Sequence, residues 1–340
     1  MRQHPFFEQQ VRAMIDLAEQ RLSLFYRDID NYKEIIVNNS PYLEDYAKKN
    51  LEKILFTGAI SLKIMNALLK DEKNNVLGTM DFMWDCLIKS RIFISTFQTI
   101  SIPGLNDLTH RLDSEVLKDH IAAGTFQNIF APPSALLQTY REALLSIDVE
   151  KNGVERRGSG FIVQRDKNSL SFVVTCLHNV DPSENIRISC IRTSSGRDIN
   201  ISEPIPIKHL DLCLFMIVDH APDVAFRLKQ FPNVFDEVYT IGYPNIPGTQ
   251  PVLVGHRGEI NALTDSYLQT SPLIIISNLV SPGSSGCPVL SNYGRCVGMT
   301  ISSPEGITEG GMQINFSAAL PAVEIWKYIC ILESQVNFGG

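Results

Sequence analysis

The sequence lacks the features that define membrane, secreted and nucleic-acid-coating proteins. Its longest uncharged stretch, residues 271–290, holds three prolines and two glycines, so it cannot form a membrane-spanning helix. Charged residues occur near the amino terminus before any apolar run could serve as a signal-peptide core. Lys and Arg number 30 against 37 Asp and Glu, a net charge of −7, and neither half of the chain is basic. We therefore expect a soluble cytoplasmic protein with no membrane contact and no direct nucleic-acid binding.

Cysteine and histidine are few and scattered. The seven cysteines form no CxxC pair, and the seven histidines form no cluster. A disulfide framework or a zinc site is therefore disfavoured, and we expect free thiols, no metal and no cofactor. The remaining composition, 44% hydrophobic and 20% charged over 340 residues, is that of a globular chain of about two domains.

The first half of the chain carries the period of amphipathic helices. Apolar residues recur at three- and four-residue intervals from Phe6 to about Phe130. We expect later helices over about 40–70, 76–97, 112–123 and 136–145. No catalytic or metal-ligating group of residues occurs in this half. We therefore predict an all-α docking or regulatory domain over residues 1–130, which contacts a protein partner, and a linker over 131–143.

After the predicted linker, short β-rich runs alternate with turn residues. This pattern is typical of an all-β sandwich or barrel, and we assign it to a domain over residues 144–340. A final helix is expected over 322–332. The expected strands are 161–164, 172–176, 186–191, 212–218, 238–241, 273–277 and 296–302.

The clearest motif lies between two of these strands and reads PGSSGCP over residues 282–288. A serine nucleophile needs a hydroxyl exposed at a tight turn, together with backbone N–H groups aimed at the developing oxyanion. Glycines on either side allow both the turn and the close approach of a substrate. The same pattern also fits a simple Gly-Ser turn between strands.

Two further polar residues lie at the ends of apolar strands. His178 follows the strand at 172–176, where an imidazole would be held rigidly at the edge of a cleft. Asp211 precedes the apolar run 212–218, where a carboxylate needs a hydrogen-bonding partner. Taken singly, each residue fits a structural or solvated role better than a catalytic one.

The three residues occur in the order His178, Asp211, Ser285 within the β-rich segment. This order resembles that of the trypsin-like (chymotrypsin-fold) serine proteases, and it is most similar to their bacterial HtrA/Deg branch. The resemblance covers about residues 144–332. Five further motifs carry it in the same order along the chain: RGSGFIV at 157–163, TCLH at 175–178, the turn at 193–199, YTIGYP at 239–244 and INFSA at 314–318.

The resemblance implies a double-barrel trypsin-like protease domain. Together with the helical period of the first half, it predicts a multidomain fold, with an N-terminal all-α helical domain followed by an all-β double-barrel trypsin-like protease domain with a C-terminal helix. It also implies a role for each residue of the motif set. Ser285 would attack the peptide carbonyl and His178 would accept and return the proton. Asp211 would orient the imidazole, and the N–H groups of Gly283 and Ser285 would form the oxyanion hole.

Other residues compete for these roles. Ser284 is a second serine in the motif, but the family places its nucleophile directly before the glycine, which selects Ser285. Asp181, Asp198 and Asp219 lack the combination of family position and apolar strand behind them. His209 shares a strand face with Asp211 and is more typical of a surface histidine than of a second base.

The sequence departs from the family pattern beside the motif residues. Cys287 replaces the usual second glycine after the nucleophile, and Cys176 and Leu177 replace two small residues before the histidine. We expect Cys287 to be a buried structural thiol. A redox switch on activity is the alternative.

The resemblance also implies where the substrate side chain before the cleaved bond would bind. No carboxylate occurs among the residues implied for this pocket, so we predict cleavage after small or medium apolar residues rather than after Lys or Arg. The implied pocket residues are Leu279, Val280, Thr300, Ser302, Asn315 and Ser317.

Control of the activity follows from the same resemblance. No activation cleavage site precedes residues 157–163, so we expect activation by ordering of the loops at 243–252 and 302–312, with permanently ordered loops as the alternative. Only eight residues follow Leu332, so we expect no PDZ domain. Helices before a lone protease domain are similar in layout to effector proteases of bacterial conflict or antiviral defence.

The sequence therefore predicts a serine endopeptidase that cleaves protein substrates through a Ser-His-Asp acyl-enzyme mechanism, controlled by its helical domain or by loop ordering. The alternative is a catalytically silent adaptor that uses the barrel fold as a peptide-binding module.

Overall fold

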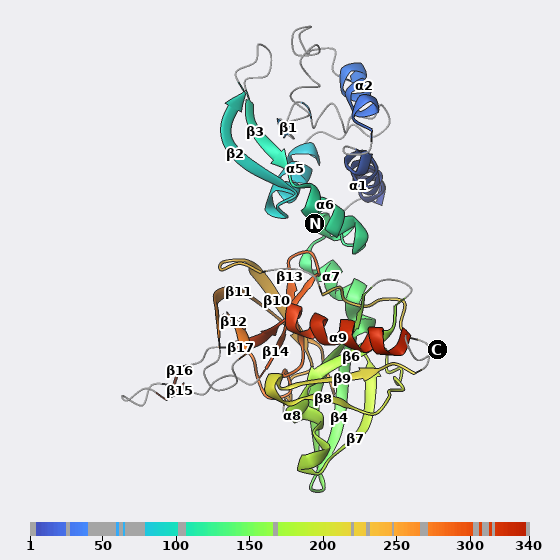
Figure 1. Cartoon of the computed structure of the whole chain (residues 1–340), viewed down its shortest axis with the longest axis vertical. Helices are drawn as coiled ribbons and strands as arrows, with labels where there is room; N and C mark the ends of the chain where they lie inside the picture. Colours follow the sequence, from blue (N-terminus) through green and yellow to red (C-terminus); the bar gives the residue numbers. More distant parts are fainter. Residues whose placement is uncertain are drawn as a thin grey trace. The chain divides into compact units, whose positions relative to one another are not determined.

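The computed structural model divides the chain into two compact units, residues 1–132 and 133–340 (Figure 1). The structure describes residues 5–24, 28–39, 59–60, 64, 79–100, 107–165, 169–218, 221–228, 232–246, 248–265, 271–301, 306–307, 313–314 and 317–337.

The first unit combines helices with a small antiparallel sheet. Its strands lie in the order β1-β3-β2. Its core is formed by apolar residues from the helices and from the sheet, including Leu22, Met83 and Phe93, each at most 1% exposed. The elements are α1 (Pro5–Leu24), α2 (Ile29–Asn39), β1 (Ala59–Ile60), α5 (Thr79–Lys89), β2 (Phe93–Ile100), β3 (Asp107–Leu112), α6 (Ser114–Ala122) and the 3-10 helix η1 (Gln127–Phe130).

The prediction of an all-α first domain is therefore wrong. The helix expected over 76–97 ends at Lys89, and Phe93–Ile100 forms β2, which pairs with β3. This segment, FISTFQTI, is rich in β-branched and aromatic residues, which favour a strand even where the apolar spacing also fits a helix. Most of the helix expected over 40–70 lies outside the described residues.

Residues 133–143 also differ from expectation, because they belong to the second unit rather than to a linker. They form α7 (Pro133–Tyr140) and the 3-10 helix η2 (Arg141–Ala143). Leu136 and Tyr140 are buried in the core of the second unit, where the Tyr140 ring stacks on Phe226 with centroids 4.7 Å apart. The second unit thus begins at Pro133 in structural terms.

The first half of the second unit is a six-stranded antiparallel sheet in the order β7-β4-β5-β6-β9-β8. Its first hairpin pairs β4 with β5 over eight residue pairs. The elements are β4 (Leu144–Lys151), β5 (Val154–Gln164), β6 (Ser171–Cys176), α8 (Leu177–Val180), η3 (Pro182–Glu184), β7 (Ile186–Thr193), β8 (Ile205–Ile207), η4 (Lys208–Leu210) and β9 (Leu212–Met216).

The second half is a closed barrel in the order β10-β11-β12-β17-β14-β13, with β13 returning to pair with β10. The separate pair β15-β16 lies outside it. The elements are β10 (Glu237–Gly242), β11 (Val254–Asp265), β12 (Pro272–Ile276), β13 (Pro288–Ser291), β14 (Cys296–Thr300), β15 (Gly306–Ile307), β16 (Gln313–Ile314), β17 (Ser317–Pro321) and α9 (Ala322–Asn337).

Each expected strand overlaps one of these elements, although the runs expected over 212–218, 273–277 and 296–302 extend past the ends of β9, β12 and β14, and α9 contains the expected C-terminal helix. Only the second half closes into a barrel. In the first half the described strands β7 and β8 are not paired with each other. Strand β8 has three residues and pairs only with β9, so it offers few groups with which to close the sheet. The prediction of two barrels is therefore confirmed for the second half only, because the described strands of the first half form an open sheet.

A single large core joins the two halves of the second unit. It combines apolar side chains of the sheet, such as Phe161 and Phe215, with barrel residues such as Met299 and Leu320, and α9 contributes Ile325. The barrel interior holds a second, smaller core that includes Val238 and Ile260. Loops that leave the sheet and the barrel next to the shared core are thereby held at fixed positions.

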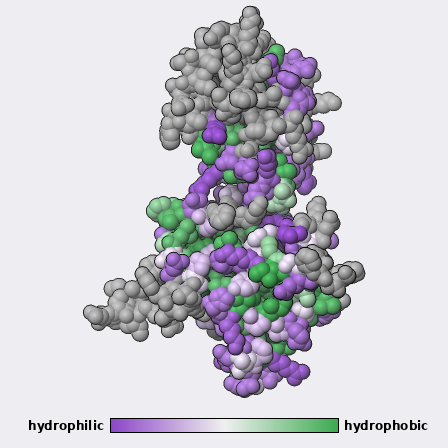
Figure 2. All heavy atoms as spheres, in the orientation of Figure 1, coloured by the Kyte–Doolittle hydropathy of each residue, from purple (hydrophilic) through white to green (hydrophobic). Residues whose placement is uncertain are grey.

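The surface of the second unit mixes apolar and hydrophilic residues over the face drawn in Figure 2. Its most exposed large apolar side chains, Phe235, Val218 and Leu279, come from separate segments of the chain. Among the described residues, no helix is long and apolar enough to cross a membrane.

Candidate active site

His178 lies in a short helix that directly follows a buried strand. Every residue of β6 after Ser171 is buried, and the chain turns directly from Cys176 into α8, which contains His178. The imidazole side chain is 36% exposed. The partly exposed His178 side chain therefore lies at the end of a buried strand, which fixes its position.

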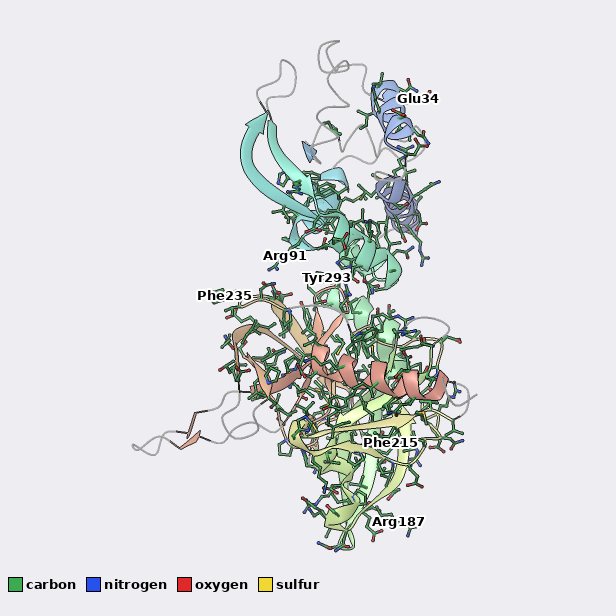
Figure 3. All side chains as sticks on the ribbon, in the orientation of Figure 1. Glu34, Arg91, Arg187, Phe215, Phe235 and Tyr293 are labelled. Atoms are coloured by element: carbon green, nitrogen blue, oxygen red, sulfur yellow. The ribbon has the colours of Figure 1, made fainter. Side chains whose placement is uncertain are left out.

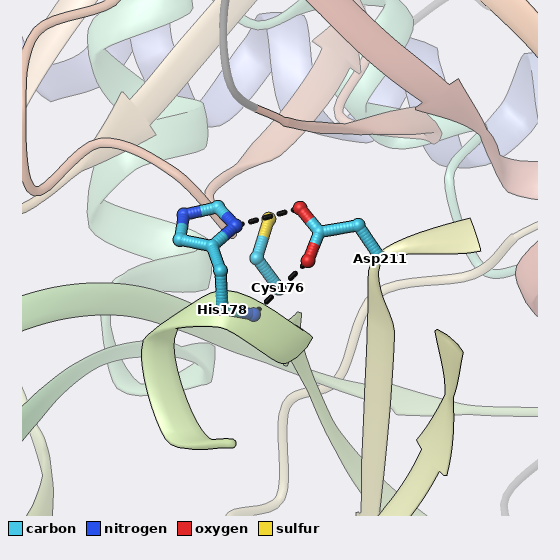
Figure 4. A group of neighbouring side chains, drawn as sticks. All are labelled: Cys176, His178 and Asp211. Carbon is cyan, nitrogen blue, oxygen red and sulfur yellow. Dashed lines mark hydrogen bonds and ion pairs between the residues drawn. The ribbon is translucent and has the colours of Figure 1, made fainter. Parts of the chain in front are cut away.

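Asp211 holds His178 through both carboxylate oxygens. The Nδ1 atom of His178 lies 2.6 Å from Oδ2 of Asp211, and the backbone N–H of His178 donates to Oδ1 at 3.0 Å (Figure 4). The backbone carbonyl of Asp211 also accepts from the N–H of Leu177 at 2.9 Å. These contacts join the end of β6 to the start of β9 and fix the position of the ring.

The backbone of Asp211 has the left-handed conformation, with φ +50° and ψ +38°. Aspartate and asparagine adopt this region more readily than other residues that carry a side chain. It ends η4 and turns the chain into the buried strand β9. The conformation therefore places the carboxylate beside His178 at the point where the strand begins.

The contact with Asp211 determines which nitrogen of the neutral ring carries the proton. Because a carboxylate can only accept hydrogen bonds, Nδ1 must be the donor, and Nε2 is left as an acceptor. A neutral His178 in this tautomer can take a proton at Nε2. The pair has the chemistry of a general base supported by a carboxylate.

Ser285 lies in the turn between β12 and β13, flanked by two glycines with positive φ. Gly283 has φ +91° and Gly286 has φ +88°. A Cβ at Gly286 would overlap the carbonyl oxygen of Ser159 and lie 2.6 Å from Oγ1 of Thr175. Both glycines are therefore required for the backbone conformation, and Gly286 is also required for the close packing of this turn against the sheet.

Three side chains from other elements fix the serine turn. The carbonyl of Ser285 accepts from Nδ2 of Asn179 at 2.9 Å, and the carbonyl of Gly283 accepts from Oγ of Ser159 at 2.7 Å. The carbonyl of Ser284 accepts from Oγ1 of Thr300 at 2.7 Å. Every carbonyl of the Gly-Ser-Ser segment thus has a side-chain donor.

The backbone N–H groups of the same segment differ in whether they donate a hydrogen bond to the backbone. The Ser284 N–H donates to the carbonyl of Ser281 at 2.9 Å, which closes the turn. Within the part of the chain that the structure describes, the N–H groups of Gly283 and Ser285 make no hydrogen bond to a backbone acceptor. Two amides on either side of Ser284, those of Gly283 and Ser285, thus remain available to bind an oxyanion.

One pocket brings the histidine and the serine together. It has a volume of 380 Å³, and its lining includes His178, Asn179, Gly283 and Ser285. Since His178 is bonded to Asp211, the pocket joins an imidazole–carboxylate pair, a serine and an amide-bearing turn. This combination can perform nucleophilic acyl transfer.

The residues predicted for the substrate pocket differ in exposure. Leu279 is 62% exposed, whereas Thr300 is fully buried and braces Ser284 rather than facing an open cavity. Ser317 is also buried, and Val280 is half-buried. None of these four lines the pocket beside His178. Ser302 and Asn315 lie outside the described residues.

Sequence reasoning missed the bracing residues Ser159 and Asn179. Ser159 lies in the motif RGSGFIV, and Asn179 directly follows the motif TCLH. The available signal was the small polar residue between two glycines, which is a common means of packing one backbone closely against another. The residues bonded by Ser159 are too distant in sequence to be identified from that pattern.

The thiols near the site are buried and protonated. Burial raises the pKa of Cys287 to about 12, and it raises that of Cys176 well above its ordinary value. Cys176 lies close enough to His178 and Asp211 for the three to surround a metal ion (Figure 4). Its Sγ donates to the carbonyl of Thr300 at 3.2 Å, however, and a protonated thiol is a poor metal ligand. These residues fit a hydrogen-bonded packing arrangement better than a metal site.

Comparison with known families agrees with this geometry. Residues 158–299, which include His178, Asp211 and Ser285, match the family described as trypsin-like peptidase domain. The match covers less than half of the chain and supports a trypsin-like fold and a protease activity for this segment. No curated protein matches the chain.

Proposed function

We propose that the chain is a serine endopeptidase in which His178, Asp211 and Ser285 form the catalytic triad. The observation that carries the proposal is the shared pocket, which unites Ser285 with an imidazole whose Nδ1 is bonded to Asp211 at 2.6 Å. The match of residues 158–299 to the trypsin-like peptidase domain supports the same assignment.

In the proposed mechanism, Oγ of Ser285 attacks the carbonyl carbon of the scissile peptide while its proton moves to Nε2 of His178. Asp211 stabilises the resulting imidazolium. The N–H groups of Gly283 and Ser285 bind the oxyanion of the tetrahedral intermediate. The C–N bond then breaks, the leaving amine takes the proton from His178, and an acyl-enzyme remains.

Water completes the cycle through the same groups. It gives a proton to Nε2 of His178 and attacks the acyl carbon, and the second tetrahedral intermediate collapses to release the carboxylate product. The proton returns to Ser285. No cofactor or metal is needed for either half of the reaction.

The wider assignments rest on sequence motifs. The resemblance to the HtrA/Deg branch favours cleavage after small or medium apolar residues and control by loop ordering. The helix-containing first unit, residues 1–132, is the proposed docking region for a protein partner. The layout of the chain suggests a cytoplasmic effector protease of bacterial defence.

A fluorophosphonate probe tests the proposal directly, because it modifies only an activated serine. We expect the purified chain, with a denatured protein substrate present, to be labelled at Ser285 and to cleave that substrate. Ser285→Ala should abolish both signals. Ser284→Ala is the matched control and should retain labelling, since the Ser284 side chain is buried and its backbone carries the contacts. Labelling that survives Ser285→Ala, or is absent from the native chain throughout, would reject the assignment.

A further inference from the structure

The pocket at the candidate active site extends away from the serine turn to a positively charged part of the first sheet. Besides the site residues, its lining includes Lys151 from β4 and both Arg156 and Arg157 from β5. Three cations around one pocket are notable in a chain whose net charge is −7. The local charge is opposite in sign to that of the whole protein.

This part of the pocket lies on the leaving-group side of the proposed nucleophile. The proton of His178 passes to the leaving amine, so the departing segment must run past His178 and the neighbouring Asn179. Both residues line the pocket together with Gly158 of β5, which packs against Asn179. The four described residues predicted to hold the acyl side, at 279, 280, 300 and 317, do not contribute to the lining. The pocket therefore receives substrate residues that follow the cleaved bond.

The three cations differ in their partners. Lys151 pairs with Glu184, and Nε of Arg157 lies 2.6 Å from Oδ1 of Asp148. Arg156 is exposed and forms no ion pair with any described residue. It is therefore the cation whose charge is free to pair with a substrate.

Arg156 is also well placed by its strand. It pairs with Val149 of β4, another residue of the pocket lining, and lies two residues before Gly158. Side chains two residues apart point to the same face of a strand, so Arg156 projects on the face where Gly158 meets Asn179. A side chain at one of the first positions after the cleaved bond can reach it.

We propose that this pocket is a subsite for acidic residues on the C-terminal side of the scissile bond, and that Arg156 is its specificity-determining residue. The proposal rests on the proposed peptidase function and adds a substrate class to it: peptides with Glu or Asp directly after the cleaved bond. An exposed ion pair contributes modestly, so we expect a preference of about 2- to 5-fold rather than strict selection.

The test uses internally quenched peptides that share one apolar residue before the cleaved bond and carry Glu-Glu, Gln-Gln or Lys-Lys after it. Values of kcat/KM are measured for the full chain and for Arg156→Gln and Arg156→Glu, with the cleaved bond identified by mass spectrometry. Arg187→Gln is the matched control, because Arg187 is an exposed arginine of the same sheet that projects from the unit (Figure 3) and does not line the pocket.

We expect the native chain and Arg187→Gln to favour Glu-Glu over Gln-Gln by about 2- to 5-fold, and the ratio to fall as salt is raised. Arg156→Gln should bring it close to 1, and Arg156→Glu should favour Lys-Lys. A native ratio of 1 or less, or a ratio that Arg156→Gln leaves unchanged, overturns the subsite.

Fluorophosphonate labelling of every variant separates the two proposals. Labelled Ser285 together with no charge preference rejects the acidic subsite and leaves the peptidase assignment standing. Absence of both labelling and cleavage in the native chain rejects the peptidase assignment, and the subsite falls with it.

Discussion

The hydroxyl of Ser159 donates to the carbonyl of Gly283 at 2.7 Å and accepts from the N–H of Tyr243 at 2.8 Å. Ser159 belongs to the sheet, whereas Gly283 and Tyr243 belong to loops of the barrel. A single buried hydroxyl therefore connects the half of the domain that carries His178 to the half that carries Ser285. Together with the hydrogen bond from Asn179 to the carbonyl of Ser285, this contact positions the serine turn against the sheet.

Ser159→Ala should lower kcat/KM about 10-fold, because loss of the hydroxyl leaves the carbonyl of Gly283 and the amide of Tyr243 without their partner. Steady-state peptide hydrolysis measures the effect. The matched control is Ser146→Ala, since Ser146 is the buried register partner of Ser159 in β4. Equal losses in the two variants would show that Ser159 has no special role in positioning Gly283.

Asp211→Asn should reduce kcat by about 10⁴-fold, the size of the effect known for this change in another serine protease. An amide at this position can donate to Nδ1 of His178, which stabilises the tautomer that cannot act as a base at Nε2. Probe labelling should slow in parallel. Asp198→Asn, at an exposed ion pair with Arg192, should keep its activity. Retention of full activity by Asp211→Asn would contradict the proposed role of the carboxylate.

Gly286→Ala should lower the free energy of unfolding by roughly 3–5 kcal/mol, since the new methyl group overlaps Ser159 and the residue has a positive φ. Gly248→Ala separates the steric cost of the methyl group from the conformational cost of the positive φ. Gly248 has φ +76° and open space where a Cβ would lie, so its cost should be about 1–2 kcal/mol, the conformational part alone. Urea denaturation of both variants gives the comparison, and equal costs would exclude the steric contribution.

The buried thiols predict a loss of stability at alkaline pH. Burial raises the pKa of both Cys213 and Cys287 from 9.0 to about 12. Between these values the unfolded chain releases protons that the folded chain retains, so the free energy of unfolding should fall as pH rises from about 9 towards 12. Denaturation under reducing conditions across this range measures the slope. Cys287→Ala should reduce it, and a slope of zero would show that these thiols ionise equally in both states.

The same burial predicts that Cys287 is not a redox switch in the native fold. At pH 8 its thiol is protonated and enclosed, so iodoacetamide should modify Cys287 only in the unfolded chain. Mass spectrometry after labelling with and without urea identifies the modified residues. Rapid modification of Cys287 in the folded protein would favour the redox alternative.

Truncation tests the boundary of the second unit. A chain that begins at Pro133 should fold, whereas one that begins at Leu144 should lose at least about 5 kcal/mol, because Leu136 and Tyr140 leave the core. That loss is comparable with the whole stability of many domains. Circular dichroism and thermal unfolding of the two chains report the difference. Equal stability would restore the interpretation of 131–143 as a linker.

Local sequence signals predicted half of the strands that the structure describes in the second unit. Each of the seven expected runs overlaps a strand, since short apolar segments bounded by turn residues are informative without long-range contacts. Strand β11 was missed because it is half-exposed and carries charged residues such as Arg257 and Glu259, which weaken the apolar pattern. The hairpin β2-β3 was missed because its apolar spacing also fits a helix.

The site was predictable only where a motif marks it. His178, Asp211 and Ser285 each occupy a recognisable position in the sequence. The contacts that hold their segments together are distant in sequence: His178 and Asp211 are 33 residues apart, and Asn179 and Ser285 are 106 residues apart. The cationic part of the pocket was not foreseen. Arg156 reaches it through the β4-β5 register, and no local pattern in the sequence specifies which strands will pair.

The left-handed backbone of Asp211 restricts which residues can occupy this position during evolution. Glutamate has the same charge, but it tolerates this backbone region poorly, and its longer side chain would displace the carboxylate from the 2.6 Å contact with His178. Asparagine tolerates the backbone but lacks the charge. Chain geometry and the proposed proton transfer therefore favour the same amino acid, so a lineage that replaces it should retain the fold and lose the proposed hydrolytic activity.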